Sequence, residues 1–300
     1  MSVWIDTDYG FDDLWAILLL RRAGVAIDGV SLVSGNATLE QVIANALGAA
    51  RAYDLDIPLH VGADRPLHRP VETARRILGP RGMQSRGRWL PEATGPRPPD
   101  DAVPALAAWL RTADGPRDVL ALGPLTNLAR LIEQEPEAAS RISRLVWMGG
   151  STGPGNHSAR AEFNALADPE ALARVAQAGI PFDIVDLMFC RGVSFGPQDM
   201  PDCDPLTADL LGGYLDIGLS RGRPGMAIYD PVAAFVLARP EAVTFEPRHL
   251  EVATDTGEAY GETRFSAPAH PLTPLPPVRL ATGTEETIAR YCLDALKKED

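Results

Sequence analysis

Two kinds of hydrophobic pattern alternate along the 300-residue chain. Short runs rich in β-branched residues predict strands, and longer Ala- and Leu-rich stretches with apolar residues at helical spacing predict amphipathic helices. This alternation is typical of a parallel sheet whose strands are joined by crossover helices. Strands are expected at Val3–Ile5, Gly29–Val33, Leu59–Val61, Asp118–Ala121, Arg144–Met148 and Phe182–Val185. Helices are expected at Leu14–Ala23, Leu39–Tyr53, Ala102–Ala113, Leu125–Glu133, Pro169–Ala178, Pro231–Ala238 and Glu285–Lys298.

Two proline-rich segments interrupt the alternation, Pro91–Pro104 and Ser266–Val278, and are expected to be surface loops. The second lies between strand-like runs, Thr263–Phe265 and Val278–Ala281, which predicts a late hairpin with a long connection. We therefore expect residues 1–300 to form a single α/β domain. Its centre should be a Rossmann-like, open and mainly parallel sheet with helices on both faces, plus a small C-terminal β-hairpin extension.

Composition narrows the possible partners. With 45% apolar residues the chain can bury a large core, and its formal net charge of −12 argues against a nucleic-acid or anionic-membrane partner. The ligand is expected to be small and either neutral or cationic. A signal-peptide pattern and an apolar run of membrane-spanning length are both missing from the sequence, so a cytoplasmic location is expected. The widely spaced Cys190, Cys203 and Cys292 are expected to be buried, reduced thiols.

Polar clusters follow several of the predicted strands, at the edge where open α/β sheets form their ligand sites. These clusters are Asp6–Asp13, Ser34–Asn36, Gly123–Asn127, Met148–Gly150 and Gly155–Asn164, and a further one, Tyr229–Pro231, opens a late helix. Since the carboxyl ends of parallel strands share one edge of the sheet, we expect the functional site there.

The densest cluster is IDTDYGFDDL, in which Asp8, Asp12 and Asp13 surround the turn between the first strand and the first helix. Any one of these carboxylates alone would be interpreted as a helix cap or a favourable first-turn charge. A helix N-terminus offers only about half a positive charge, which does not offset three carboxylates, so a divalent cation such as Ca²⁺ or Mg²⁺ is expected among them. An EF-hand loop is excluded because Gly10 stands at its fifth position. A haloacid-dehalogenase-like phosphatase, with Asp6 and Asp8 after its first strand, remains an alternative despite Gly10.

The ordered motifs resemble those of a known family. IDTDYGFDDLWAI is similar to the DxDxGxDDxxAI signature of the inosine-uridine-preferring nucleoside hydrolases. The similarity continues in order through SGNATLEQVIANA, VGADRPL, LALGPLTNLA, VWMGG, GNHSARAEFNALADPEA and YDPVAA. It extends from Val3 to the final helix, and a series of motifs in order is far more specific than a single Asp-x-Asp.

The resemblance implies a Ca²⁺-dependent hydrolase of N-ribosides and assigns a role to each acidic position. Carboxylates at Asp8, Asp13 and Asp230 and the main-chain carbonyl of Thr126 would hold Ca²⁺, together with a water and the ribose 2' and 3' hydroxyls. Asp8 would also take the proton from the metal-bound water that attacks the anomeric carbon. Thr126 is equally consistent with a plain helix start, which is compatible with a role for its carbonyl.

The resemblance also implies contacts to the sugar of a small-molecule nucleoside. Asp12, Asn36 and Asn164 would bind the ribose diol, Asn156 and Glu162 the 5'-hydroxyl, and Met148 would pack under the ribose. Family members usually form dimers or tetramers, so a homodimer or homotetramer is expected. The reaction passes through a sugar with oxocarbenium character, which an acidic pocket stabilises.

Several of these residues have simpler explanations. Asn36 follows a glycine and fits an ordinary turn, and Asp230 precedes a proline in the way a helix cap does. Glu162 and Asn164 flank Phe163, and the alternation predicts a buried Phe163 with the two polar side chains together on the opposite face.

The sequence departs from the family at the position that assists the leaving base. Many relatives carry a histidine directly before the late aspartate, where this chain has Tyr229, and another in a loop where this chain has Leu78 within ILGPRGMQSRG. Help for the leaving base would then come from Tyr229, from His157, from stacking by an aromatic residue such as Trp89, or from none of these.

The missing histidines leave two other functions open. One is a catalytically silent protein that binds ribose or a nucleoside, and the other is the Mg²⁺-dependent phosphatase. The base itself is not identified by the sequence, because base contacts in this family come from variable loops, here expected at Leu78–Pro91 and Met188–Leu219.

Overall fold

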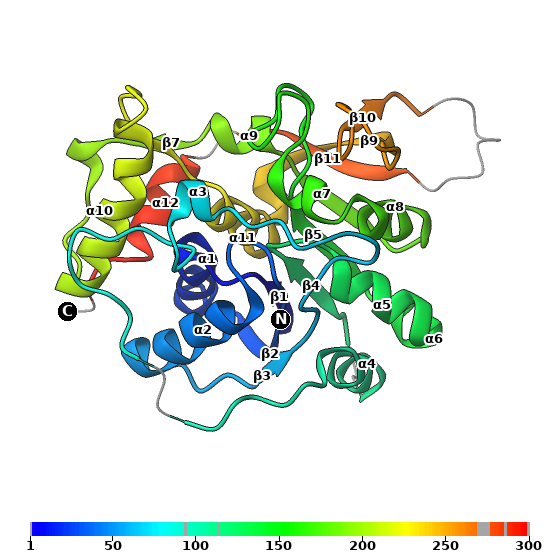
Figure 1. The fold of residues 1–300 in the computed structure, drawn as a ribbon, viewed down its shortest axis with the longest axis horizontal. Coiled ribbons are helices and arrows are strands. Elements are labelled where there is room, and N and C mark those ends of the chain that lie inside the picture. Colours follow the sequence, from blue (N-terminus) through cyan, green and yellow to red (C-terminus); the bar gives the residue numbers. More distant parts are fainter. Residues whose placement is uncertain (1, 93–94, 113–114, 269–276, 285–286, 299–300) are drawn as a thin grey trace.

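A sheet of nine strands forms the centre of the computed structural model, which describes residues 2–92, 95–112, 115–268, 277–284 and 287–298. Figure 1 shows these strands with helices packed around them. The spatial order is β10-β9-β11-β6-β5-β4-β1-β2-β3. The bounds are β1 (Ser2–Thr7), β2 (Ala26–Leu32), β3 (Leu59–Val61), β4 (Asp118–Ala121), β5 (Arg144–Met148), β6 (Phe182–Val185), β9 (Val243–Val252), β10 (Thr263–Ser266) and β11 (Val278–Thr284).

Helices connect most of the strands. They are α1 (Phe11–Arg22), α2 (Leu39–Tyr53), α3 (Arg75–Leu78), α4 (Ala102–Thr112), α5 (Thr126–Gln134), α6 (Pro136–Ala139), α7 (Phe163–Ala167), α8 (Pro169–Gln177), α9 (Leu187–Arg191), α10 (Pro205–Leu219), α11 (Asp230–Ala238) and α12 (Ile288–Asp294). Two short strands outside the main sheet, β7 (Ser194–Phe195) and β8 (Met226–Ala227), pair with each other in antiparallel fashion.

The pairing pattern confirms the predicted α/β fold. β1 pairs in parallel with β2 on one side and β4 on the other, and the parallel ladder continues through β5 and β6 to β11. Strand order therefore reverses between β1 and β4, as in Rossmann-like sheets. The antiparallel pairs of β9 with β10 and β11 lie at one end of the sheet.

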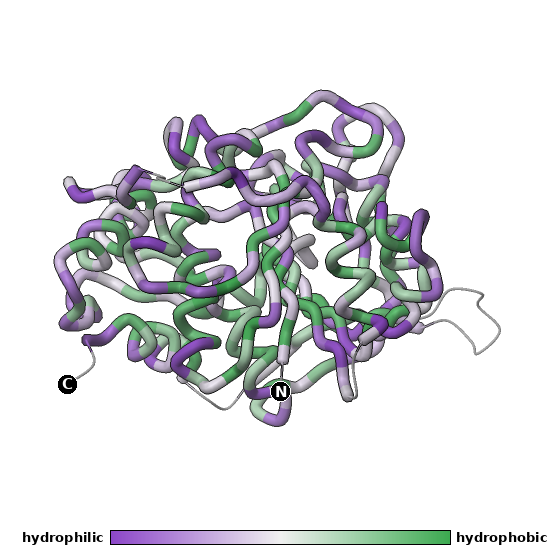
Figure 2. Tube along the Cα trace, turned by 90° about the horizontal axis from the view of Figure 1, so that it is seen from below, coloured by the Kyte–Doolittle hydropathy of each residue, from purple (hydrophilic) through white to green (hydrophobic). Residues whose placement is uncertain are grey.

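Alternation along β1 explains how helices cover both faces. Val3 and Ile5 belong to the hydrophobic cluster that includes α1, α11 and α12, whereas Trp4 joins the cluster that includes α4 and α5. Residues next to each other in a strand point to opposite faces, so a continuous apolar strand needs helices on both sides. Figure 2 shows the hydrophobic residues concentrated along the inner strands and helices and the hydrophilic ones in outer loops.

The predicted helix and strand positions are confirmed with small shifts at most ends. α1 begins at Phe11 and not at Leu14, and α12 ends at Asp294 and not at Lys298. The start of α1 is fixed locally: Gly10 is the N-cap, and the backbone N–H of Gly10 donates to Asp13 Oδ2 at 2.7 Å. The acidic residues that were interpreted as early helix charges thus also set where the helix begins.

The predicted pairing of the late hairpin is wrong. Thr263–Phe265 and Val278–Ala281 do form antiparallel strands, but each pairs with β9, which lies between them. β9 escaped prediction because its residues are mostly half-exposed and include Pro247. The proline-rich connection lies mostly outside the described residues, as do residues 285–286 of the predicted last helix, whose described part is α12.

Met188–Leu219, expected to be largely a variable loop, contains α9 and the 15-residue helix α10. The sequence hides α10 because Gly212 and Gly213 sit in its middle, and glycine is a weak helix former. The fold needs a glycine at 213, since a Cβ there would lie 2.3 Å from the backbone of Gln84. Asp204 caps the helix by accepting from the N–H groups of Leu206 and Thr207.

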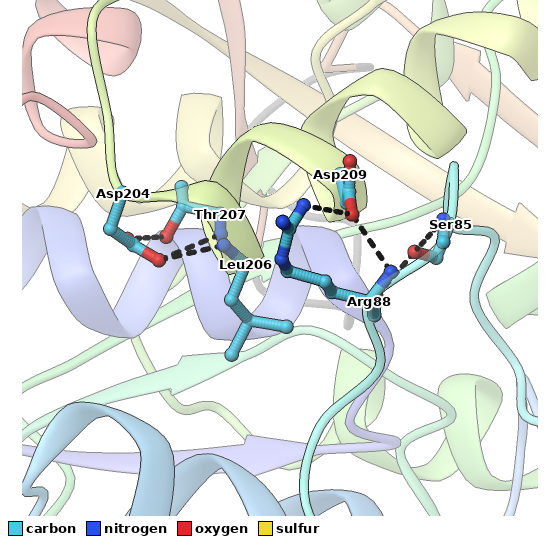
Figure 3. A network of polar contacts seen from close by, with 7 residues as sticks. Ser85, Arg88, Asp204, Leu206, Thr207 and Asp209 are labelled. Carbon is cyan, nitrogen blue, oxygen red and sulfur yellow. Dashed lines mark hydrogen bonds and ion pairs between the residues drawn. The ribbon is translucent and has the colours of Figure 1, made fainter.

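Ion pairs fasten α10 to the segment that follows α3. Asp209 accepts from the backbone N–H of Arg88 at 2.8 Å and from its guanidinium at 3.0 Å, as Figure 3 shows. Arg86 pairs with Asp216 through two hydrogen bonds of 2.9 and 2.7 Å. These contacts hold α10 as one wall of the site described below.

The cysteines are free and buried, as expected, at Cys190, Cys203 and Cys292. Among the described residues, the helices all fall short of the length and apolar character that crossing a membrane requires.

Candidate active site

A cavity of about 220 Å³ opens at the carboxyl ends of the parallel strands, next to the reversal of strand order between β1 and β4. This is where open α/β sheets bind ligands. The cavity is lined by all the residues predicted to contact the sugar, together with Tyr229 and Asp230. Those predicted sugar contacts are Asp12, Asn36, Met148, Asn156, Glu162 and Asn164.

Local hydrogen bonds fix the orientation of Asp13 in the segment that follows β1. Tyr9 adopts a positive φ of 39°, and its N–H donates to Thr7 Oγ1 at 3.0 Å. The Thr7 hydroxyl in turn donates to Asp13, which also accepts from Gly10. Asp13 is fully buried, so its orientation is set by these hydrogen bonds and not by solvent.

Three carboxylates come together at the cavity, where Asp12 and Asp230 belong to the lining and Asp13 is buried next to them. One oxygen each from Asp12, Asp13 and Asp230 lies within 4.8 Å of the others. Burial raises the pKa of all three above the usual 3.8, and repulsion from neighbouring carboxylates adds to this rise for Asp12, whose pKa reaches about 7, and for Asp230. Buried oxygen donors at this spacing fit a hard divalent cation.

Asp8 lies beside this group, but both of its carboxylate oxygens accept hydrogen bonds from Asn36. Its Oδ2 accepts from the backbone N–H of Asn36 at 2.6 Å, and its Oδ1 accepts from the Asn36 side chain at 3.0 Å. Gly35 permits the approach, since a Cβ there would lie 2.1 Å from Asp8 Oδ2. Burial and the neighbouring Asp13 raise the pKa of Asp8 well above its usual range. Asp12, predicted as a sugar contact, thus groups with Asp13 and Asp230, and the role of Asp8 as a cation ligand stays a prediction.

Thr126 stands at the first position of α5, as the simpler interpretation expected. Its hydroxyl donates to Asp168 Oδ2 at 2.6 Å, and the predicted role of its carbonyl as a cation ligand stays a prediction. The next residue, Asn127, has a structural task, because its side chain bonds Asp6, the carbonyl of Leu32 and the N–H of Ala63. These contacts tie together the ends of β1, β2 and β3.

The alternation argument for Glu162 and Asn164 is wrong, because Phe163 begins helix α7 and not a strand. Glu162 is the N-cap of α7, and its carboxylate accepts from the N–H groups of Gly150, Asn164 and Ala165 at 2.9 to 3.1 Å. Burial nevertheless raises the pKa of Glu162 to about 7. Asn164 uses both side-chain hydrogens on the carbonyls of Leu122 and Met148, which leaves its amide oxygen for a ligand.

The cavity lining also includes Tyr229 and Leu78, the two residues found where relatives often have histidines. Burial raises the pKa of the Tyr229 hydroxyl above its usual 10, while Arg191 and Arg223 oppose that rise. His157 also lines the cavity, but its Nε2 is bonded to Glu72 at 2.5 Å. Its imidazole is therefore already engaged.

Trp89 does not supply the aromatic stacking suggested from the sequence. It lies outside the cavity lining and holds the guanidinium of Arg81 over its ring at 4.7 Å. Sequence reasoning missed other lining residues, most of them on or near α10: Arg191, Tyr214, Ile217, Arg221, Arg223 and Met226. The Asp-Pro start of α10 was the signal that could have placed this wall.

A cavity with clustered carboxylates at this edge of an α/β sheet defines an enzyme that acts on a small molecule. The model of the inosine-uridine preferring nucleoside hydrolase family matches residues 3–288. The chain therefore belongs to that family of hydrolases, which act on N-glycosyl compounds.

Individual relatives agree with this assignment. The chain is 34% identical over 270 residues to the non-specific ribonucleoside hydrolase RihC of Salmonella agona, an alignment that covers 88% of this chain and 87% of that one. It also resembles the solved structures of the plant nucleoside hydrolase PpNRh1 (TM-score 0.87, 23% identity, 99% of each chain) and an inosine-guanosine nucleoside hydrolase (TM-score 0.87, 23% identity, 98% of each chain). At such identities the two structures establish a shared fold.

Proposed function

We propose that the protein hydrolyses the N-glycosidic bond of ribonucleosides or closely related N-ribosides to give ribose and the free base. The observation that carries the proposal is the group of Asp12, Asp13 and Asp230, two of which line a cavity that is also lined by every predicted sugar contact. Identity to a relative named as a ribonucleoside hydrolase supports the same substrate class.

We assign Ca²⁺ as the cation, held by Asp8, Asp13, Asp230 and the carbonyl of Thr126, with Asp12 adjacent. Carboxylates and carbonyl oxygens are the donors that Ca²⁺ prefers, and burial makes their unshielded charges costly. When bound, Ca²⁺ would supply positive charge and Lewis acidity toward water and the ribose hydroxyls.

Asp8 is proposed as the general base. It is buried, and its raised pKa makes its carboxylate a stronger proton acceptor than an exposed aspartate. Asn36 fixes both of its oxygens, so the base is oriented before the substrate arrives. Asp8 would take a proton from the water that attacks the anomeric carbon.

The remaining residues position the sugar. Asp12, Asn36 and Asn164 would face the 2' and 3' hydroxyls, and Asn156 and Glu162 the 5'-hydroxyl. Met148 would pack under the ribose. As the bond to the base breaks, positive charge develops on the sugar, and the surrounding carboxylates stabilise it. Tyr229 would stack on the base. We also propose that the enzyme works as a homodimer or homotetramer, which light scattering after size-exclusion chromatography tests.

A panel of nucleosides assayed for released reducing sugar tests the function directly. Hydrolysis of at least one ribonucleoside is expected, with loss of activity in a Ca²⁺ chelator and recovery on adding Ca²⁺ back. Asp8→Asn should abolish turnover, whereas the control Asp64→Asn, an exposed residue paired with Arg65, should not. Binding of nucleosides by the native protein without any release of sugar would instead support the silent binding protein.

A further inference from the structure

Charge is unevenly distributed along the cavity. The inner end carries the carboxylates of Asp12 and Asp230, whereas the outer wall carries the guanidinium groups of Arg191, Arg221 and Arg223. A ligand that fills the cavity therefore meets negative charge near its sugar and positive charge at its far end. Because the protein has a net charge of −12, a group of arginines in the cavity lining suggests a role in binding a negatively charged group.

Two of the arginines have no acidic partner. Among the described residues, neither Arg221 nor Arg223 forms an ion pair. Arg86, in the segment after α3, differs from them because it pairs with Asp216 of α10 at 2.7 Å. Arg191 is already used, because it donates to the carbonyls of Pro154 and Gly155 at 3.2 and 3.1 Å.

The backbone that carries these two arginines is well fixed. Both of their N–H groups donate to the carbonyl of Gly218, at 3.1 and 3.2 Å, and Gly222 between them has a φ of 70°. Gly218 itself packs so closely on Gly225 that a Cβ would lie 2.2 Å from the Gly225 carbonyl oxygen. The turn after α10 thus fixes the backbone of two arginines that both line the cavity, and guanidinium groups are the side-chain donors best suited to binding a carboxylate.

The residues that stand where relatives often place histidines are poor proton donors. Tyr229 carries a phenol, which is a much weaker acid than an imidazolium, and Leu78 carries no acid, while the Nε2 of His157 is bonded to Glu72. Purine and pyrimidine bases leave as anions unless they are protonated. A base whose ring nitrogen is already quaternised needs no proton, because it leaves as a neutral molecule.

From the charge distribution and the missing donor we propose that the preferred substrate is a zwitterionic N-riboside. Its base is a pyridinium ring, cationic at the ribosylated nitrogen, that bears a carboxylate bound by Arg221 and Arg223. This rests on the proposed hydrolase function and names its substrate class. The cationic ring lies between the inner carboxylates and the face of Tyr229, both of which favour positive charge.

The reaction balances without an acid. The bond between the anomeric carbon and the ring nitrogen breaks, its electron pair returns to the nitrogen, and pyridine carboxylate leaves. Water adds its oxygen to the anomeric carbon and gives up one proton, first to Asp8 and then to solvent. Each turnover therefore releases one proton, whereas hydrolysis of a neutral nucleoside releases none.

The test compares three substrates on the Ca²⁺-loaded native enzyme: the riboside of pyridine-3-carboxylate, the matching carboxamide riboside, and p-nitrophenyl riboside. The carboxylate riboside should have a kcat/KM about tenfold or more above that of the carboxamide, the size expected for one charge-assisted contact. Arg221→Gln/Arg223→Gln should bring this ratio close to one, because kcat/KM for the carboxylate riboside should fall more than kcat/KM for the carboxamide riboside. Arg290→Gln on α12, an exposed arginine, should keep the ratio of the native enzyme.

The outcomes separate the two proposals. Two results would overturn the assignment of the arginines. One is an equal kcat/KM for the carboxylate and carboxamide ribosides, and the other is a preference for the carboxylate that persists in a folded double variant. In either case, hydrolysis of p-nitrophenyl riboside would still support the enzyme function. If none of the ribosides is cleaved, the proposed function fails and the substrate class fails with it. Folding of the variants is checked by their thermal unfolding.

Discussion

Asn36 holds both carboxylate oxygens of Asp8, one through its backbone N–H at 2.6 Å and the other through its side-chain Nδ2 at 3.0 Å. The contact joins the turn after β1 to the turn after β2, so the orientation of the proposed base depends on a neighbouring strand. An asparagine that looks like an ordinary turn residue in the sequence therefore also positions the base.

Asn36→Ala should weaken catalysis more than stability. It removes one hydrogen bond to Asp8 and a proposed ribose contact but keeps the backbone bond, so kcat/KM for a ribonucleoside should fall about 10- to 100-fold. The free energy of unfolding should change by about 1 kcal/mol. Gln41→Ala, at a side chain that bonds Asn45 away from the cavity, is the matched control. Equal kcat/KM values for Asn36→Ala and the control would refute a role in positioning Asp8.

Tyr229 should act through its ring and not through its hydroxyl. Tyr229→Phe should keep most of the activity, whereas Tyr229→Ala should lose about tenfold or more because a stacked base is worth roughly 1–3 kcal/mol. p-Nitrophenyl riboside should be cleaved faster than natural nucleosides, since its leaving group needs little protonation. If Tyr229→Phe proves as inactive as Tyr229→Ala, the hydroxyl is the acid and stacking is not its role.

Ca²⁺ should stabilise the native enzyme because it relieves the repulsion among buried carboxylates. At a concentration 100 times its Kd, a ligand of the folded state alone adds about 2.7 kcal/mol to the free energy of unfolding. Thermal unfolding in Ca²⁺, in Mg²⁺ and in chelator measures this effect, and Asp230→Asn should remove most of it while Asp64→Asn keeps it. A midpoint independent of Ca²⁺ in the native enzyme would argue against the assigned cation.

Glu162 should make stability depend on pH. Its pKa is raised from 4.5 to about 7 in the folded protein, so the folded state binds more protons than the unfolded state between these values. The stabilisation is complete below pH 4.5 and is lost as the pH rises toward 7, by on the order of 3 kcal/mol in total. Glu162→Gln should flatten this dependence, and Glu137→Gln, at an exposed position, should not. An unchanged slope in Glu162→Gln would place the titration on other groups.

Local sequence signals were enough to predict the inner end of the site. Asp12 and Asp13 follow a strand and start a helix, so their positions depend on a few neighbouring residues. The wall formed by α10 could not be predicted in the same way, because Tyr214 and Ile217 come from a helix whose internal glycines resemble a loop. Trp89 shows the opposite error, since an aromatic residue in the expected loop packs instead on Arg81. Which side chains face a cavity depends on tertiary packing, and a single sequence carries little information on that.

Trp15 of α1 donates a hydrogen bond at 2.7 Å to the carbonyl of Cys292 in α12, 277 positions later in the chain. The helix that bears Asp12 and Asp13 therefore reaches its final packing only after α12 has been made. Closing so long a loop is slow, so during translation the carboxylates of the turn before α1 lack part of their final surroundings until α12 emerges. Activity should therefore not appear before α12 has been made, and a nascent chain halted before α12 should expose the apolar face of α1 to chaperones.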